Sequence, residues 1–157
     1  MRKILLSAAA VTMLFTACKK KDDNGTGNGL GKNQWKVGST TYNSLGVSGA
    51  MGLIVASGTN GGTELSTFTV GFANNAYPTS GGQFNIVDVA NDPNELSVNV
   101  GTSNTGGNSQ AWGSSASGNP QATVTVDGGK VTVSIPQITV TGASSSSTTF
   151  SGNVTQN

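Results

Sequence analysis

The 157-residue chain contains no histidine and only one cysteine, Cys18. Without histidine it lacks the commonest general base and the commonest metal ligand of proteins. One cysteine can form neither an internal disulfide framework nor a thiolate zinc site. Chemistry that depends on either residue type is therefore not expected in the body of this chain.

Charged and aromatic side chains are also scarce. Charged residues make up 10% of the chain, against about 25% in an average protein. Lysine and arginine total 8 and aspartate and glutamate 7, which gives a net charge of +1. So small a charge argues against a nucleic-acid partner attracted by the overall field of the protein. Aromatic residues make up 6%, so we expect a thin and mainly aliphatic core.

Residues 1–17 have the features of a bacterial secretory signal. Two basic residues precede an apolar run over residues 4–15, which is shorter than the roughly 20 residues of a membrane-spanning helix. Phe15-Thr16-Ala17-Cys18 resembles the lipobox of bacterial lipoproteins, with Phe15 where the family usually has leucine. The resemblance implies cleavage before Cys18 and attachment of acyl chains such as palmitate, which would anchor the protein in a lipid bilayer. An ordinary signal with an incidental cysteine is the alternative.

The residues after Cys18 are similar to the start of many lipoproteins of the Bacteroidota. In those proteins a lysine followed by two acids resembles a surface-export signal, and Lys21, Asp22 and Asp23 match this pattern after two extra lysines. The resemblance implies an outer-membrane lipoprotein that faces the cell exterior. The alternative is a charged segment that contacts anionic lipid headgroups. Residues 18–33 are rich in glycine and asparagine, and we expect a flexible tether there.

From residue 34 to residue 157 the pattern predicts a single all-β domain. Short runs of β-branched residues alternate with polar residues, which is typical of half-buried strands. The candidate strands are residues 35–37, 41–43, 50–56, 64–72, 83–89, 96–100, 122–126, 131–135 and 148–155. This spacing predicts an antiparallel β-sandwich of eight or nine short strands, with a small closed β-barrel as the alternative.

The clearest local pattern is a hairpin over residues 122–135. Its two alternating runs flank Asp127-Gly128-Gly129, and these residue types accept the positive φ of tight hairpin turns. Pro136, which follows, cannot donate a ladder hydrogen bond. The apolar alternation changes phase between Ile135 and Ile138, as one inserted residue would cause. We therefore expect an edge or a bulge at Pro136.

Residues 101–119 and 142–149 lack the alternation and are predicted to be long loops. Trp112 is the one large side chain in the first of them. A tryptophan in a polar loop can stack on a sugar or anchor a protein interface, and the alternative is that it covers the end of the core. Tyr77 also lies in turn-rich sequence. Trp112 and Tyr77 are therefore the candidate ligand-binding residues.

The acids of the body suggest little chemistry. Asp88, Asp92 and Glu95 surround a turn and form a candidate calcium site, although their spacing matches no EF-hand and a solvated turn is the simpler interpretation. A carboxylate pair could hydrolyse a glycosidic bond without histidine. Such pairs usually lie in aromatic-lined clefts, which this chain can scarcely build. We expect no enzyme activity and no cofactor.

The body resembles small, uncharacterised Bacteroidota lipoproteins, which share an opening like residues 35–42, a middle like residues 67–84 and a final strand like residues 150–154. The resemblance implies a secreted β domain and no particular chemistry. We therefore expect a non-catalytic binding or accessory domain that recognises a glycan or an envelope protein. A structural subunit of an outer-membrane assembly is the alternative, and a small carboxylate-dependent hydrolase is a remote one.

Overall fold

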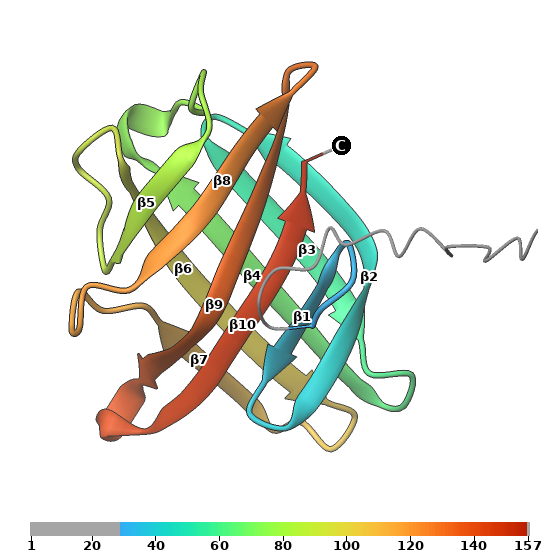
Figure 1. Ribbon diagram of the computed structural model, residues 1–157. Coiled ribbons are helices and arrows are strands. Elements are labelled where there is room, and N and C mark those ends of the chain that lie inside the picture. Colours follow the sequence, from blue (N-terminus) through green and yellow to red (C-terminus); the bar gives the residue numbers. More distant parts are fainter. Residues whose placement is uncertain (1–28, 157) are drawn as a thin grey trace, which may run out of the picture.

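The computed structural model describes residues 29–156, which form an all-β domain (Figure 1). Its ten strands are β1 (Gln34–Val37), β2 (Thr40–Ala50), β3 (Leu53–Thr59), β4 (Glu64–Phe72), β5 (Gly82–Val87), β6 (Glu95–Asn104), β7 (Ser109–Gly113), β8 (Gln121–Asp127), β9 (Lys130–Gly142) and β10 (Ser147–Thr155). Two short 3₁₀ turns are η1 (Ala73–Asn75) and η2 (Ala143–Ser145). The predicted fold class is confirmed. Within residues 29–156 no helix has the length and apolar character needed to span a membrane.

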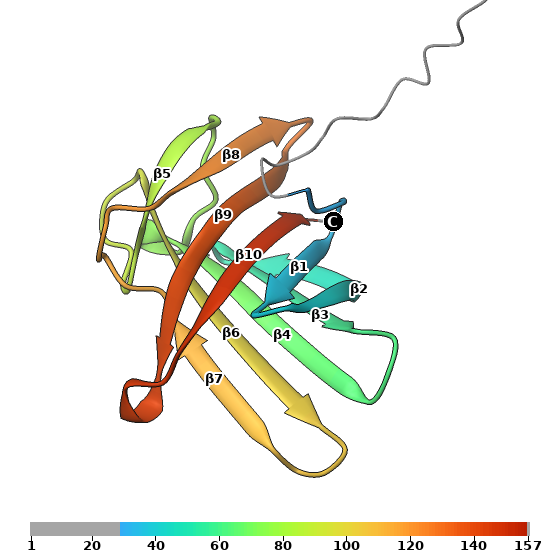
Figure 2. The same cartoon turned by 60° about the horizontal axis from the view of Figure 1, so that its bottom comes forward.

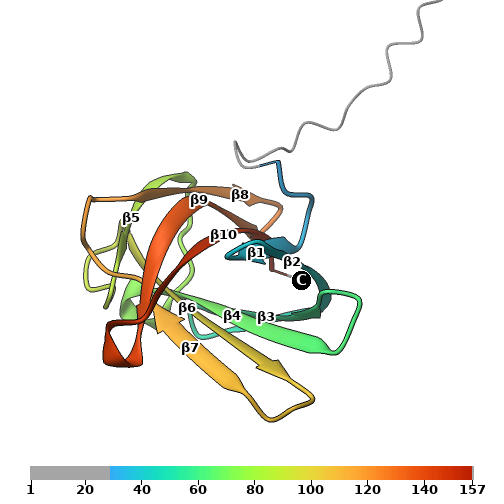
Figure 3. The same ribbon diagram turned by 90° about the horizontal axis from the view of Figure 1, so that it is seen from below.

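The strands form one sheet that folds over into two facing layers. Figure 3 shows β8, β9, β10 and β1 in one layer and β3, β4, β6 and β7 in the other. Pairing runs in the order β10–β1–β2–β3–β4–β6–β5–β8–β9, and β9 pairs in turn with β10. The arrangement is sandwich-like, as predicted, and continuous pairing joins its two layers.

The sheet is mixed, whereas the prediction was purely antiparallel. β5 and β6 run parallel over three residue pairs, from Asn85–Glu95 to Val87–Ser97. Parallel neighbours usually need a crossover of a dozen or more residues. Here the connection is only residues 88–94. It can be short because three paired residues span about 10 Å, which is the distance the chain has to return along β5 before β6 begins.

The loop predicted over residues 101–119 is present over residues 114–119, but the prediction is wrong for residues 101–113. Residues 101–104 continue β6, and β7 pairs with β6 from Ser103–Ser109 to Asn99–Gly113. Figure 2 shows that the β6–β7 hairpin extends beyond the neighbouring strands. Its outer residues are exposed or half-buried, so they need no apolar face and carry no alternating pattern. The strand predicted over residues 50–56 is present from Leu53 in β3 but begins too early, because Met51 and Gly52 form a tight turn with φ of 48° and 69° between β2 and β3.

The hairpin and the bulge predicted near residue 136 are both present. Gly128 and Gly129 have positive φ, and Asp127 pairs with Lys130 across the turn between β8 and β9. Further along β9, Ile138 pairs with Phe150 and Ile135 pairs with Gly152. Two residues of β9, Pro136 and Gln137, therefore lie opposite one residue of β10. This bulge keeps both isoleucines buried although the alternation changes phase between them.

An aromatic cluster stabilises the centre of the aliphatic core. Trp35, on β1, lies 4.9 Å from Phe68 and 6.1 Å from Tyr42, measured between ring centroids. Its indole Nε1 donates to Ser66 Oγ at 2.9 Å, and that hydroxyl donates to the backbone oxygen of Gly101 at 2.9 Å. The one polar atom of the indole is therefore satisfied inside the core, as buried polar groups need to be.

Part of the predicted flexible tether is packed on the body. Leu30 is only 8% exposed. The backbone oxygen of Asn33 accepts from Ser44 N at 3.0 Å, and its side-chain Oδ1 accepts from Thr155 N at 2.8 Å. Residues 30–33 therefore belong to the folded domain. The predicted signal peptide (residues 1–17), Cys18 and the export residues Lys21, Asp22 and Asp23 lie outside the described residues.

Candidate functional site

Trp112 lies on β7 and not in a loop. It is 8% exposed and belongs to the hydrophobic core. It pairs with Val100 on β6 and with Gly142 on β9. A Cβ atom at Gly142 would lie 2.8 Å from Trp112 Cδ1, so glycine is needed there to make room for the indole. The position favours the interpretation that Trp112 covers the end of the core, whereas a ligand contact stays a prediction.

The acidic turn between β5 and β6 is held by its own hydrogen bonds. Glu95 Oε2 accepts from the backbone N of Asn91 at 2.9 Å and of Asp92 at 3.1 Å, and these bonds lower the pKa of the Glu95 carboxyl. Asp88 Oδ1 accepts from Val89 N. In the part of the chain from residue 29 to residue 156, no three His, Cys, Asp or Glu side chains group in a way that could hold a metal ion. The candidate calcium site is therefore not supported in this part of the chain, and the carboxylates of Asp88 and Glu95 accept hydrogen bonds within the turn.

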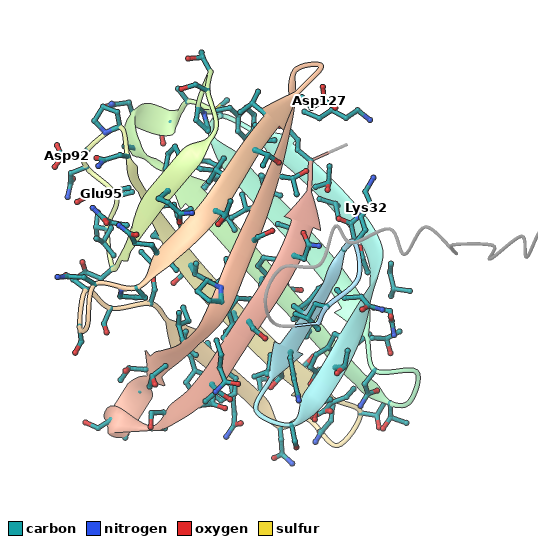
Figure 4. All side chains as sticks on the ribbon, viewed as in Figure 1. Lys32, Asp92, Glu95 and Asp127 are labelled. Atoms are coloured by element: carbon teal, nitrogen blue, oxygen red, sulfur yellow. The ribbon has the colours of Figure 1, made fainter. Side chains whose placement is uncertain are left out.

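Within residues 29–156, charged side chains lie at both sides of the domain. Asp92 and Glu95 lie at one side of the domain, and Lys32 lies at the other (Figure 4). Tyr42 is 1% exposed, and burial, assisted by the neighbouring Glu64 carboxylate, raises the pKa of its hydroxyl to about 12. Tyr42 is therefore neutral near pH 7 and a poor proton donor or acceptor there.

Tyr77 is fixed beside the core at the loop that follows η1. Its hydroxyl donates to the backbone oxygen of Leu53 at 2.6 Å, and its ring lies edge-to-face on Phe72 with 6.2 Å between centroids. Phe72 in turn lies edge-to-face on Phe84 at 5.9 Å. Burial raises the pKa of the Tyr77 hydroxyl. Because both ends of the side chain are held, its ring has a defined orientation.

These rings line a cavity of about 250 Å³, which we call the Tyr77 pocket. Its lining consists of Phe72, Ala73, Asn74, Ala76, Tyr77, Pro78, Thr79, Ser80, Phe84 and Pro93. No charged side chain is among them. The pocket therefore combines aromatic and proline rings with neutral amide and hydroxyl groups, a composition typical of small-molecule sites.

The η1 turn holds part of this lining in an uncommon backbone conformation. Asn74 and Asn75 have φ of 58° and 51°, in the left-handed region. Asparagine enters this region more readily than other residues with a side chain. The β2–β3 turn packs closely on η1, since a Cβ atom at Gly52 would lie 2.5 Å from Ala76 N. The β2–β3 turn therefore packs against the backbone of Asn75 and Ala76, directly after Asn74.

The sequence indicated only one member of this pocket as a site residue. Tyr77 was a candidate ligand-binding residue, whereas Phe72 and Phe84 were expected only as alternating strand residues. Asn74 was not singled out. The run Asn74-Asn75 next to Tyr77-Pro78 is a turn signal that could have drawn attention to it. Comparison of the chain with protein-family models, with curated proteins and with solved structures finds no match.

Proposed function

We propose that this chain is a lipid-anchored outer-membrane protein that faces the cell exterior and whose β domain binds a ligand without catalysis. The Tyr77 pocket is the observation that carries the binding role, because it offers an oriented aromatic ring beside neutral amide and hydroxyl groups and no charged side chain. The residues around Cys18 support the anchor through their resemblance to lipoproteins. The proposed partners are the bilayer, through acylated Cys18, and a glycan or an envelope protein.

A structural subunit of an outer-membrane assembly is the second candidate. It is favoured by large apolar side chains on the surface, of which Met51 is 79% and Leu45 70% exposed. Copurification of a tagged full-length protein from its native envelope distinguishes the two roles, since a subunit would be recovered in a fixed ratio with its partner.

Replacing Cys18 by alanine is expected to release the protein from membranes or to stall it as an uncleaved precursor. The acyl chains are the proposed anchor, and each buried methylene contributes about 0.8 kcal/mol to membrane binding. Mass spectrometry of the wild-type N-terminus should show a peptide that begins with acylated Cys18. An unmodified N-terminal peptide that begins elsewhere would refute the anchor.

Replacing Asp22 and Asp23 together by alanine is expected to retain the protein on the periplasmic side of the outer membrane. The measurement is protease treatment of intact cells, which should degrade the wild type and spare the variant. The variant Asp127→Ala, which changes an acid of the body, is the control and should be degraded like the wild type. Equal protection of all three would place the wild type inside the outer membrane.

A further inference from the structure

We propose that the Tyr77 pocket binds a single ring of a neutral sugar. The inference rests on the proposed binding function and names both the site and the chemical class of its ligand. In this role the half-buried rings of Tyr77 and Pro78 contact the apolar face of the sugar, and the amide of Asn74 bonds its hydroxyl groups.

The size of the pocket limits the ligand to about one ring. Its volume of about 250 Å³ is that of about eight molecules of liquid water, each of which occupies roughly 30 Å³. Pockets for drug-sized ligands measure about 300–1,000 Å³. A single ring fits this space, whereas a longer chain would have to continue outside it.

The lining selects against charge. No lysine, arginine, aspartate or glutamate lines the pocket, so a phosphate, a carboxylate or an amine would lose hydration without gaining an opposite charge. A purely apolar ligand would make no hydrogen bond to the exposed amide of Asn74 or to the hydroxyls of Thr79 and Ser80. A molecule with an apolar face and a hydroxyl-bearing edge satisfies both parts of the lining, and a neutral sugar has both.

The aromatic part of the lining is oriented before any ligand arrives. The Tyr77 ring is held by its bond to Leu53 O and by its edge-to-face contact with Phe72. The Asn74 side chain is exposed, so water covers it until a ligand replaces that water. Binding therefore orders few groups of the protein, which reduces its entropic cost.

Asn74 and Asn75 provide a matched pair of variants. Both residues have left-handed φ, which glycine adopts without strain, so Asn74→Gly and Asn75→Gly should both fold. Only Asn74 lines the pocket. Removing its amide should weaken sugar binding by about tenfold, as expected for the loss of one or two neutral hydrogen bonds. Asn75→Gly should bind like the wild type.

The test is a titration of the mature full-length protein, followed through its backbone amide NMR signals in a detergent without a sugar headgroup. The probes are glucose, galactose, mannose and N-acetylglucosamine, with choline chloride as a cationic ligand of similar size. At least one sugar should cause saturable shifts at Ala76–Ser80, and Asn74→Gly should weaken them selectively. Both variants should melt close to the wild type.

Four results would overturn the inference. If choline but no sugar shifts the signals of these residues, the ligand is a cation and not a neutral sugar. If sugar binding is weakened equally in Asn74→Gly and Asn75→Gly, the amide of Asn74 has no specific role. Saturable sugar shifts confined to the surroundings of Trp112 would retain the binding function and reject this site. If no probe binds while Cys18 is acylated, the sugar inference fails and the proposed membrane anchor stands.

Discussion

Replacing Val124 by aspartate is expected to leave the protein unfolded at 25 °C. Val124 is 1% exposed and lies on β8 between Gly82 of β5 and Val133 of β9. A carboxyl group at this position would lose its hydration inside the core. The cost is several kcal/mol whether the group is charged or takes up a proton, and the total stability of a domain is about 5–15 kcal/mol.

The matched control is Thr125→Asp, the next residue of the same strand. Thr125 faces solvent, so the variant adds the same group without burying it. Circular dichroism during heating should show a cooperative transition for the control and none for Val124→Asp. A cooperative transition in Val124→Asp within a few degrees of the control would mean that the two layers do not pack at Val124.

Replacing Trp112 by alanine is expected to destabilise the domain by about 3–5 kcal/mol, because a buried aromatic ring is lost and a cavity remains. The indole covers the core where β6, β7 and β9 meet and is 8% exposed. For a domain of this length the melting temperature should fall by about 10 °C or more. Gln110→Ala, at an exposed position of the same strand, is the control and should melt like the wild type.

The opposite result would restore the other interpretation of Trp112. If the melting temperature is unchanged and copurification of an envelope partner is lost, the indole is a contact residue. The sugar titration separates the two roles as well. If Trp112 only covers the core, Trp112→Ala should show the same sugar shifts at Ala76–Ser80 as the wild type, at a temperature where the variant is folded.

The features that the sequence predicted correctly are those governed by local rules. The hairpin at Asp127-Gly128-Gly129 follows from the positive φ of its turn, and the bulge at Pro136 follows from the missing N–H and the shifted alternation. Each depends on a few neighbouring residues, so each is visible in a single sequence.

The features that the sequence missed depend on distant partners or on the absence of a core. The outer part of the β6–β7 hairpin contacts little apolar surface, so its residues have no alternation to detect. The turn at Met51 has a left-handed residue with no turn preference. At the candidate site Tyr77 was a candidate from its turn-rich surroundings, whereas Asn74 joins it through the fold of η1, next to which the β2–β3 turn packs on Asn75 and Ala76.

The position of β1 has a consequence for export. β1 lies between β2 and β10, and its residue Gln34 pairs with Asn153 near the far end of the described chain. In a chain that crosses a membrane with its N-terminus first, β1 emerges before β10. The edge of β1 that pairs with β10 therefore stays unpaired until β10 has emerged. Contacts of such long sequence separation form slowly. In the proposed export, the pairing between β1 and β10 would therefore form only after β10 has emerged on the far side of the membrane.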